Sequence, residues 1–130
     1  MPTQVIHTDL APAAIGPYSQ AVSVRMDTAE KLVFCSGQIG LDPATGNLRD
    51  GFEAQVDQAL ANLQAVIAAA HGRLGGIVKL TLFLTDLGNF AAVNAKMEAL
   101  LSKPYPARST VGVASLPKGA LFEIEAIVAI

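Results

Sequence analysis

The chain has 130 residues, of which 52% are hydrophobic and 15% charged, and its formal net charge is −2. The length predicts one domain, residues 1–130, and the composition excludes intrinsic disorder. The scattered Lys and Arg residues argue against a nucleic-acid surface, and no apolar run reaches the ~20 residues of a membrane span. Cys35 is the single cysteine, so an internal disulfide is excluded and we expect a reducing, cytoplasmic location.

The periodicity of the sequence predicts six strands and two helices in the order β-β-β-α-β-α-β-β. A polar stretch with Asp27 and Glu30 suits a hairpin loop between the second and third strands. In chain order, strands are expected at residues 3–8, 21–25 and 32–39, a helix at 50–71, a strand at 78–84, a helix at 89–101, and strands at 108–114 and 121–130. The order favours an α+β fold with a mixed sheet and both helices on one face.

The helix ends carry recognisable signals. Asp50 and Glu53 have the spacing of a capping box at the start of the first helix, and Gly72 is expected just after its end. Asp86 or Asn89 is expected to cap the second helix.

The last predicted strand alternates strictly, with one apolar face that should meet the helices: Phe122, Ile124, Ala126, Val128 and Ile130. Its other face is charged at one end and apolar at the other. Two helices cannot cover both faces of six strands, and monomers avoid large exposed apolar surfaces. We therefore expect other copies of the chain to cover the second face.

The sequence contains no metal-ligand cluster, P-loop or nucleophile elbow, and His7 and His71 are far apart. We therefore expect neither a metal nor an organic cofactor. Cys35 lies in a predicted strand, where a buried structural thiol is the default interpretation.

Arg108 and Glu123 are the residues most suited to chemistry, because Arg108 opens one of the last two predicted strands and Glu123 lies near the start of the other. One interpretation is an exposed charge pair of little energetic value. The other is an arginine fork that binds a carboxylate, with an acid/base carboxylate nearby. Two further positions are unusual: Tyr18 follows a proline in a loop, and Gly37 ends a strand where a ligand could approach the backbone.

Several motifs together resemble the RidA family, also called YjgF/YER057c/UK114. They cover nearly the whole chain and keep the order and spacing of the family: AAIGPYSQA at residues 13–21, SGQI at 36–39, PARS at 106–109, and LPK with FEIEA at 116–126. The resemblance implies a chorismate-mutase-like α+β fold, with a six-stranded sheet and two helices, in a homotrimer with ligand clefts between subunits. It also implies 2-iminobutanoate/2-iminopropanoate deaminase activity, which hydrolyses enamine and imine intermediates to 2-keto acids and ammonia.

The resemblance also implies roles for individual residues. Arg108, Glu123 and Tyr18 match the catalytic residues of the family cleft, and Arg108 with Gly37 and Thr110 match its substrate-binding positions. Thr110 stands where many members have cysteine, and the segment at residues 101–108 is shorter than in typical members.

Two alternatives remain open beside this one. The first is a regulatory or chaperone-like module of the same family that binds small carboxylates, and turnover of a freshly generated imine distinguishes it from an enzyme. The second is a deaminase for a larger imine or enamine, which the shorter segment allows. A ribonuclease would need a basic groove, which the net charge of −2 does not favour.

Overall fold

The computed structural model describes residues 3–15, 18–26 and 30–130, so Gly16, Pro17 and Asp27 lie outside the described residues. The described elements follow the predicted order: β1 (Thr3–Ile6), β2 (Ala21–Arg25), β3 (Lys31–Gln38), α1 (Phe52–Ala69), β4 (Ile77–Leu84), α2 (Phe90–Leu100), β5 (Ala107–Gly112) and β6 (Phe122–Ala129). Short 3₁₀ turns lie at η1 (Leu74–Gly76), η2 (Leu87–Asn89) and η3 (Pro117–Gly119). None of the described helices is long and apolar enough to cross a membrane.

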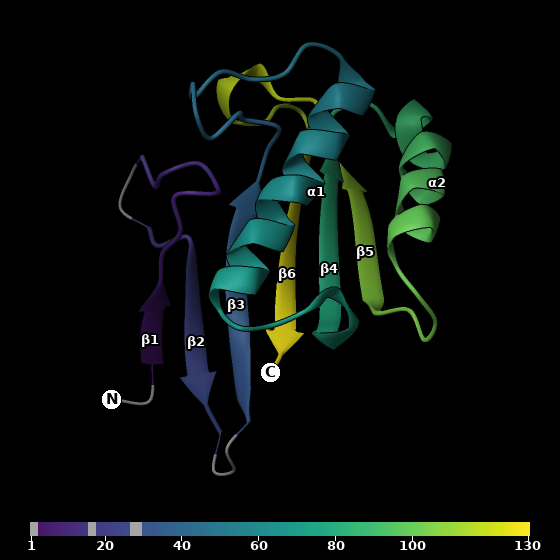
Figure 1. Cartoon of the computed structure of the whole chain (residues 1–130). Coiled ribbons are helices and arrows are strands. Elements are labelled where there is room, and N and C mark those ends of the chain that lie inside the picture. Colours follow the sequence, from purple (N-terminus) through teal and green to yellow (C-terminus); the bar gives the residue numbers. More distant parts are fainter. Residues whose placement is uncertain (1–2, 16–17, 27–29) are drawn as a thin grey trace.

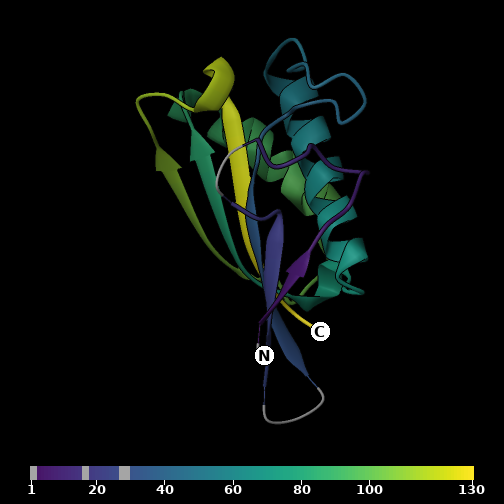
Figure 2. The same cartoon turned by 90° about the vertical axis from the view of Figure 1, so that its left-hand side faces the viewer.

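The six strands form one mixed sheet in the order β1-β2-β3-β6-β4-β5 (Figure 1). β4 and β5 are parallel, and every other neighbouring pair is antiparallel. A parallel pair needs a crossover connection, and α2 provides it between β4 and β5. Both helices lie on the same face of the sheet (Figure 2), which confirms the predicted α+β architecture.

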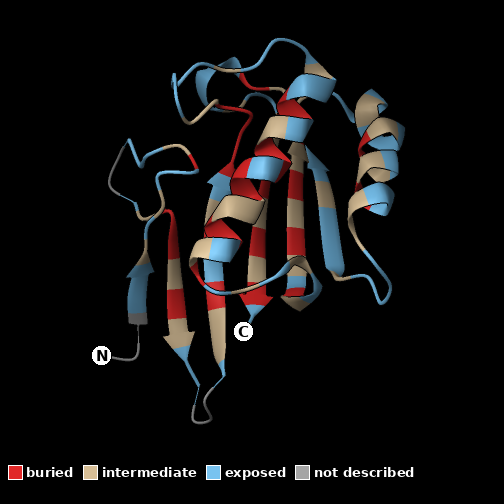
Figure 3. Ribbon diagram, viewed as in Figure 1, coloured by how far each residue is buried: buried red, intermediate tan, exposed pale blue. Residues whose placement is uncertain are grey.

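The core lies between α1 and the central strands (Figure 3). The alternation predicted for the last strand is confirmed, because Phe122, Ile124, Ala126 and Val128 are all buried on the helix side. The Phe122 ring meets Phe52 of α1 edge to face, with ring centroids 6.3 Å apart.

The predicted capping box at the start of α1 is wrong. Gly51 is the N-cap with a φ of 87°, and no side chain caps the helix. The left-handed φ is readily adopted by glycine, and it starts the helix one residue too late for Asp50 to act as the cap.

The end of α1 also differs from the sequence-based expectation. His71, with a φ of 65°, takes the left-handed position, and Gly72 follows it. The His71 and Gly72 amides donate to the carbonyls of Ala68 and Ile67, both at 2.9 Å, which is the Schellman arrangement. At α2, Asn89 is the N-cap without a side-chain bond, and Asp86 instead accepts from the Gly88 amide in η2 at 2.8 Å.

The face of the sheet opposite the helices carries apolar side chains. Phe34 and Val111 are 43% and 40% exposed, and Phe83 and Ile127 are half-buried. These residues come from four strands, so the apolar surface extends across most of the sheet.

Candidate functional site

A hollow of about 90 Å³ lies at the end of the sheet where β3 ends and β6 begins. Tyr18, Gly37 and Glu123 all line it, together with Pro12 from the segment before β2 and Lys118 from η3. We call it the Glu123 hollow. These three residues, all singled out from the sequence, come from distant parts of the chain and line the same hollow.

A β-bulge brings Gly37 against Glu123. The register of β3 on β6 shifts between Cys35 and Gln38, so β3 has one extra residue there. A Cβ atom on Gly37 would lie 2.5 Å from Oε2 of Glu123, closer than side chains tolerate. Glycine is therefore required at this position for the carboxylate to lie against the backbone.

The surroundings of Glu123 favour its protonated form. The side chain is half-buried, and this burial raises its pKa above the ordinary value of 4.5. The negative charge of Glu125, two residues along β6, raises the pKa further. A carboxylate with a raised pKa is a better proton acceptor near neutral pH than an ordinary one.

Tyr18 and Lys118 lie at the edge of the Glu123 hollow. Tyr18 is 51% exposed, and its hydroxyl accepts a long hydrogen bond of 3.4 Å from the Ile15 amide. Lys118 is exposed and has a φ of 57°, a backbone conformation that costs energy for a residue with a side chain. The sequence reasoning did not single out Lys118 beyond its place in the LPK motif, because nothing in the local pattern signals a left-handed lysine.

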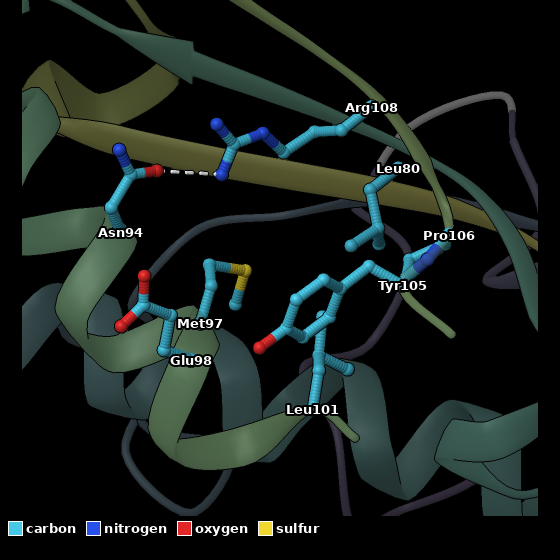
Figure 4. A pocket seen from close by; sticks show the side chains of 8 residues that line it. All are labelled: Leu80, Asn94, Met97, Glu98, Leu101, Tyr105, Pro106 and Arg108. Atoms are coloured by element: carbon cyan, nitrogen blue, oxygen red, sulfur yellow. Dashed lines mark hydrogen bonds between the residues drawn. The ribbon is translucent and has the colours of Figure 1, made fainter. Parts of the chain in front are cut away.

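Arg108 lines a different hollow, of about 330 Å³, between α2 and the start of β5 (Figure 4). Its Nη1 donates to Oδ1 of Asn94 at 2.7 Å, and its guanidinium carbon lies 5.4 Å from the ring centre of Phe90. The guanidinium is exposed. These two contacts hold the guanidinium while leaving most of its five N–H donors for a ligand.

The remaining wall of the Arg108 hollow is mixed in character. Figure 4 shows the Tyr105 ring between Leu101 and Leu80, and the Glu98 carboxylate near the helix turn that carries Asn94. Together with Met97, these side chains give an apolar floor with charged groups around it.

Arg108 and Glu123 do not meet within one chain. β4 lies between β5 and β6, and β5 runs antiparallel to β6, so the two residues lie toward opposite ends of the sheet. Arg108 pairs with Leu80 on the helix side, whereas Glu123 faces the open side with Phe83. Within a single subunit the two residues therefore form neither an exposed charge pair nor one cleft.

Thr110 lies two residues after Arg108, on the same face of β5. Its Oγ1 is buried and makes no hydrogen bond with any described residue. A buried hydroxyl without a partner is costly, and it marks a position where a water or ligand could bind. Among the described residues, no group of three His, Cys, Asp or Glu side chains is placed to hold a metal ion.

The family model for Endoribonuclease L-PSP matches residues 8–130. The chain belongs to the RidA (YjgF) family. A 2-iminobutanoate/2-iminopropanoate deaminase of Salmonella typhimurium is 46% identical to this RidA-family chain, over 96% of both chains.

Solved structures of RidA-family proteins share this fold. RidA from an Antarctic Psychrobacter is 50% identical, with a TM-score of 0.89 over 98% of this chain and 99% of that one. Escherichia coli TdcF, solved with bound serine, is 40% identical, with a TM-score of 0.84 over 98% of both chains.

Proposed function

We propose that this RidA-family chain is a 2-iminobutanoate/2-iminopropanoate deaminase, a hydrolase that converts reactive imines to 2-keto acids and ammonia. The observation that carries the proposal is the half-buried Glu123, with its raised pKa, held against the glycine backbone of β3. The deaminase name of close relatives supports it.

The chemistry matches the residues. A 2-imino acid presents a carboxylate beside an electrophilic C=N carbon, and Arg108 can bind that carboxylate through two parallel hydrogen bonds. A water attacks the carbon of the protonated imine, and Glu123 accepts one water proton and delivers it to the nitrogen of the resulting carbinolamine. The C–N bond then breaks as the hydroxyl oxygen forms the C=O bond, and the hydroxyl proton passes to Glu123 or to water. The products are a 2-keto acid and ammonia. The protonated imine is itself a strong electrophile, so these steps use only side chains of the chain and water.

Because Arg108 and Glu123 lie apart within a single chain, we propose that the complete site forms between subunits of a homotrimer. In this arrangement Arg108 of one subunit reaches the Glu123 hollow of the next. The apolar open face of the sheet, with Phe34 and Val111 exposed, supports the assembly.

Light scattering is expected to give a mass about three times the chain mass of 13.5 kDa. A stable monomer at micromolar concentration would contradict both the trimer and the site shared between subunits.

Cys35 is expected to be dispensable for turnover. Its side chain is buried, and burial raises the pKa of the thiol to about 11, so the nucleophilic thiolate is scarce at neutral pH. Cys35→Ser should keep most of the deaminase activity, with Cys35→Ala as a second variant that adds no hydroxyl to the core. A loss beyond about a hundredfold in both correctly assembled variants would indicate covalent catalysis instead.

A buried free thiol also suits a reducing compartment, and we propose a cytoplasmic location on that ground.

A coupled assay tests the activity itself. A threonine or serine dehydratase generates the imine in place, and keto-acid formation is followed with and without this protein. A rate above the uncatalysed hydrolysis supports the enzyme. Carboxylate binding without any rate increase would support the regulatory module instead.

The Arg108 hollow favours a second candidate, a deaminase for larger imines. Its volume of about 330 Å³ and its floor of Leu80, Met97 and Leu101 could hold an apolar side chain longer than ethyl. Repeating the assay with imines made by an amino-acid oxidase from alanine, leucine and phenylalanine distinguishes the candidates. Turnover that rises with side-chain length would favour the larger substrate.

A further inference from the structure

Gln20, the residue before β2, has a buried side chain that the proposed reaction does not use. It is only 3% exposed, although long polar side chains are seldom buried without a purpose. Its Oε1 accepts from the Thr8 amide at 2.7 Å. Its Nε2 donates to the carbonyls of Thr8 at 2.9 Å and Pro12 at 2.8 Å. The carboxamide thus uses its acceptor and both of its donors.

These bonds replace a missing strand partner. The described part of the segment between β1 and β2, residues 7–15 and 18–20, contains no helix or strand, so its backbone groups have no ladder to join. Gln20 binds both the N–H and the C=O of Thr8, as a neighbouring strand would, and then reaches Pro12. Pro12 lines the Glu123 hollow, so the carboxamide anchors one wall of the hollow.

The main chain of the same residue is fixed to the opposite wall. The Ser36 amide donates to the Gln20 carbonyl at 2.8 Å, and the Ser36 hydroxyl donates to the Ser19 carbonyl. Ser36 lies in the β-bulge directly before Gly37, which is the backbone that Glu123 approaches. Gln20 therefore connects the Pro12 wall, through its side chain, to the Gly37 wall, through its backbone.

We propose that Gln20 is a positioning residue for the Glu123 hollow. Its carboxamide holds the segment from Thr8 to Pro12 at a fixed place relative to Gly37 and Glu123. The proposal rests on the proposed function of that hollow, because a positioned wall matters only if the hollow binds a reacting molecule. Small displacements of a wall can cost large factors in rate, since reacting groups must be held in near-attack geometry.

Gln20→Met keeps the approximate shape of the side chain and removes all of its hydrogen bonds, including a long one of 3.5 Å from Nε2 to the Ala11 carbonyl. We expect the variant to assemble and to lose at least about tenfold in kcat/KM for imine hydrolysis. Gln20→Glu keeps the acceptor for the Thr8 amide but loses both donors at neutral pH, and it should lose activity too. The matched control is Ile67→Val, a buried α1 position away from the hollow, which lowers the melting temperature without touching the anchor.

The accessibility of Tyr18 to a fluorescence quencher is a measurement that general destabilisation should not change. The sequence has no tryptophan and two tyrosines, so a Tyr105→Phe background leaves Tyr18 as the only source of tyrosine fluorescence. In that background, Gln20→Met should increase acrylamide quenching of Tyr18, whereas Ile67→Val should not. In the parent protein, the Thr8 amide should be protected from hydrogen exchange although it lies outside β1.

Unchanged activity and unchanged Tyr18 quenching in Gln20→Met would overturn the proposal, as would rapid exchange of the Thr8 amide. Equal losses in Gln20→Met and Ile67→Val would reduce Gln20 to a contributor to stability, which also overturns it. A parent protein without deaminase activity would instead contradict the proposed function. The quenching and exchange measurements separate the two failures, because they need no turnover.

Discussion

Arg108→Lys is expected to lower kcat/KM by at least about thirtyfold while the fold and the assembly survive. Lysine keeps the positive charge but cannot present the planar pair of donors that binds both oxygens of a carboxylate. A charge-assisted, bidentate contact in a partly dry cleft contributes about 2–4 kcal/mol, which corresponds to about 30- to 1,000-fold in rate. The hydrogen bond to Asn94 at 2.7 Å restrains the guanidinium, which lowers the entropy cost of binding a carboxylate. Steady-state kinetics of the coupled assay measure the effect.

Arg49→Lys is the matched control. Arg49 is half-exposed and pairs with Asp42 at 3.2 Å, outside both hollows. Surface pairs of this kind contribute little, so the exchange should leave the kinetics unchanged. If Arg108→Lys hydrolyses the imine as fast as the parent, the carboxylate-fork mechanism is wrong and Arg108 is an ordinary strand-end charge.

Mixed trimers test whether Arg108 acts in the hollow of a neighbouring subunit. Arg108→Ala and Glu123→Gln subunits are each expected to keep at most about 3% of the parental rate alone. Random mixing at equal amounts should restore about a quarter of the parental clefts, because each mixed ring contains one cleft with both parental residues. A site within one subunit would give no recovery at all.

The sequence predicted the strands and helices well where burial imposes a period. β6 alternates because it lies at the centre of the sheet under α1, so every second side chain must be apolar. The ends of α1 were predicted less well. Gly51 and His71 adopt positive φ angles that depend on how the chain enters and leaves the helix.

The placement of the candidate site residues was only partly predictable. The motifs identified Tyr18, Gly37 and Glu123, but no periodicity shows that a β-bulge brings Gly37 against Glu123. The separation of Arg108 from Glu123 follows from the strand order, in which β4 lies between β5 and β6. Strands that follow one another in the sequence are usually neighbours in a sheet, so β6 would be expected beside β5. Here β6 instead lies in the middle of the sheet, between β3 and β4.

Glu123→Gln is expected to lower kcat by about a hundredfold or more, because general acid–base catalysis contributes factors of that size. Glutamine keeps the size of the side chain and removes its ability to accept the proton of the attacking water. Binding of an unreactive carboxylate such as 2-ketobutyrate should change far less, since Arg108 carries that contact. Calorimetric titration of the variant and the parent measures the second quantity.

The pH dependence of kcat/KM tests the role of the Glu123 carboxylate directly. Burial and the Glu125 charge raise the pKa of Glu123, so kcat/KM of the parent should fall with decreasing pH at values above the ordinary 4.5. Glu125→Gln removes one of these causes and should move the acid limb to lower pH while leaving the protein active.

Because the raised pKa disfavours the ionised carboxylate in the folded state, the free energy of unfolding should decrease as pH rises from the ordinary pKa to the raised one. Glu123→Gln should abolish that decrease, and it should melt at a higher temperature than the parent at neutral pH. A parent acid limb that survives in Glu123→Gln would assign the titration, and with it the proton transfer, to another group.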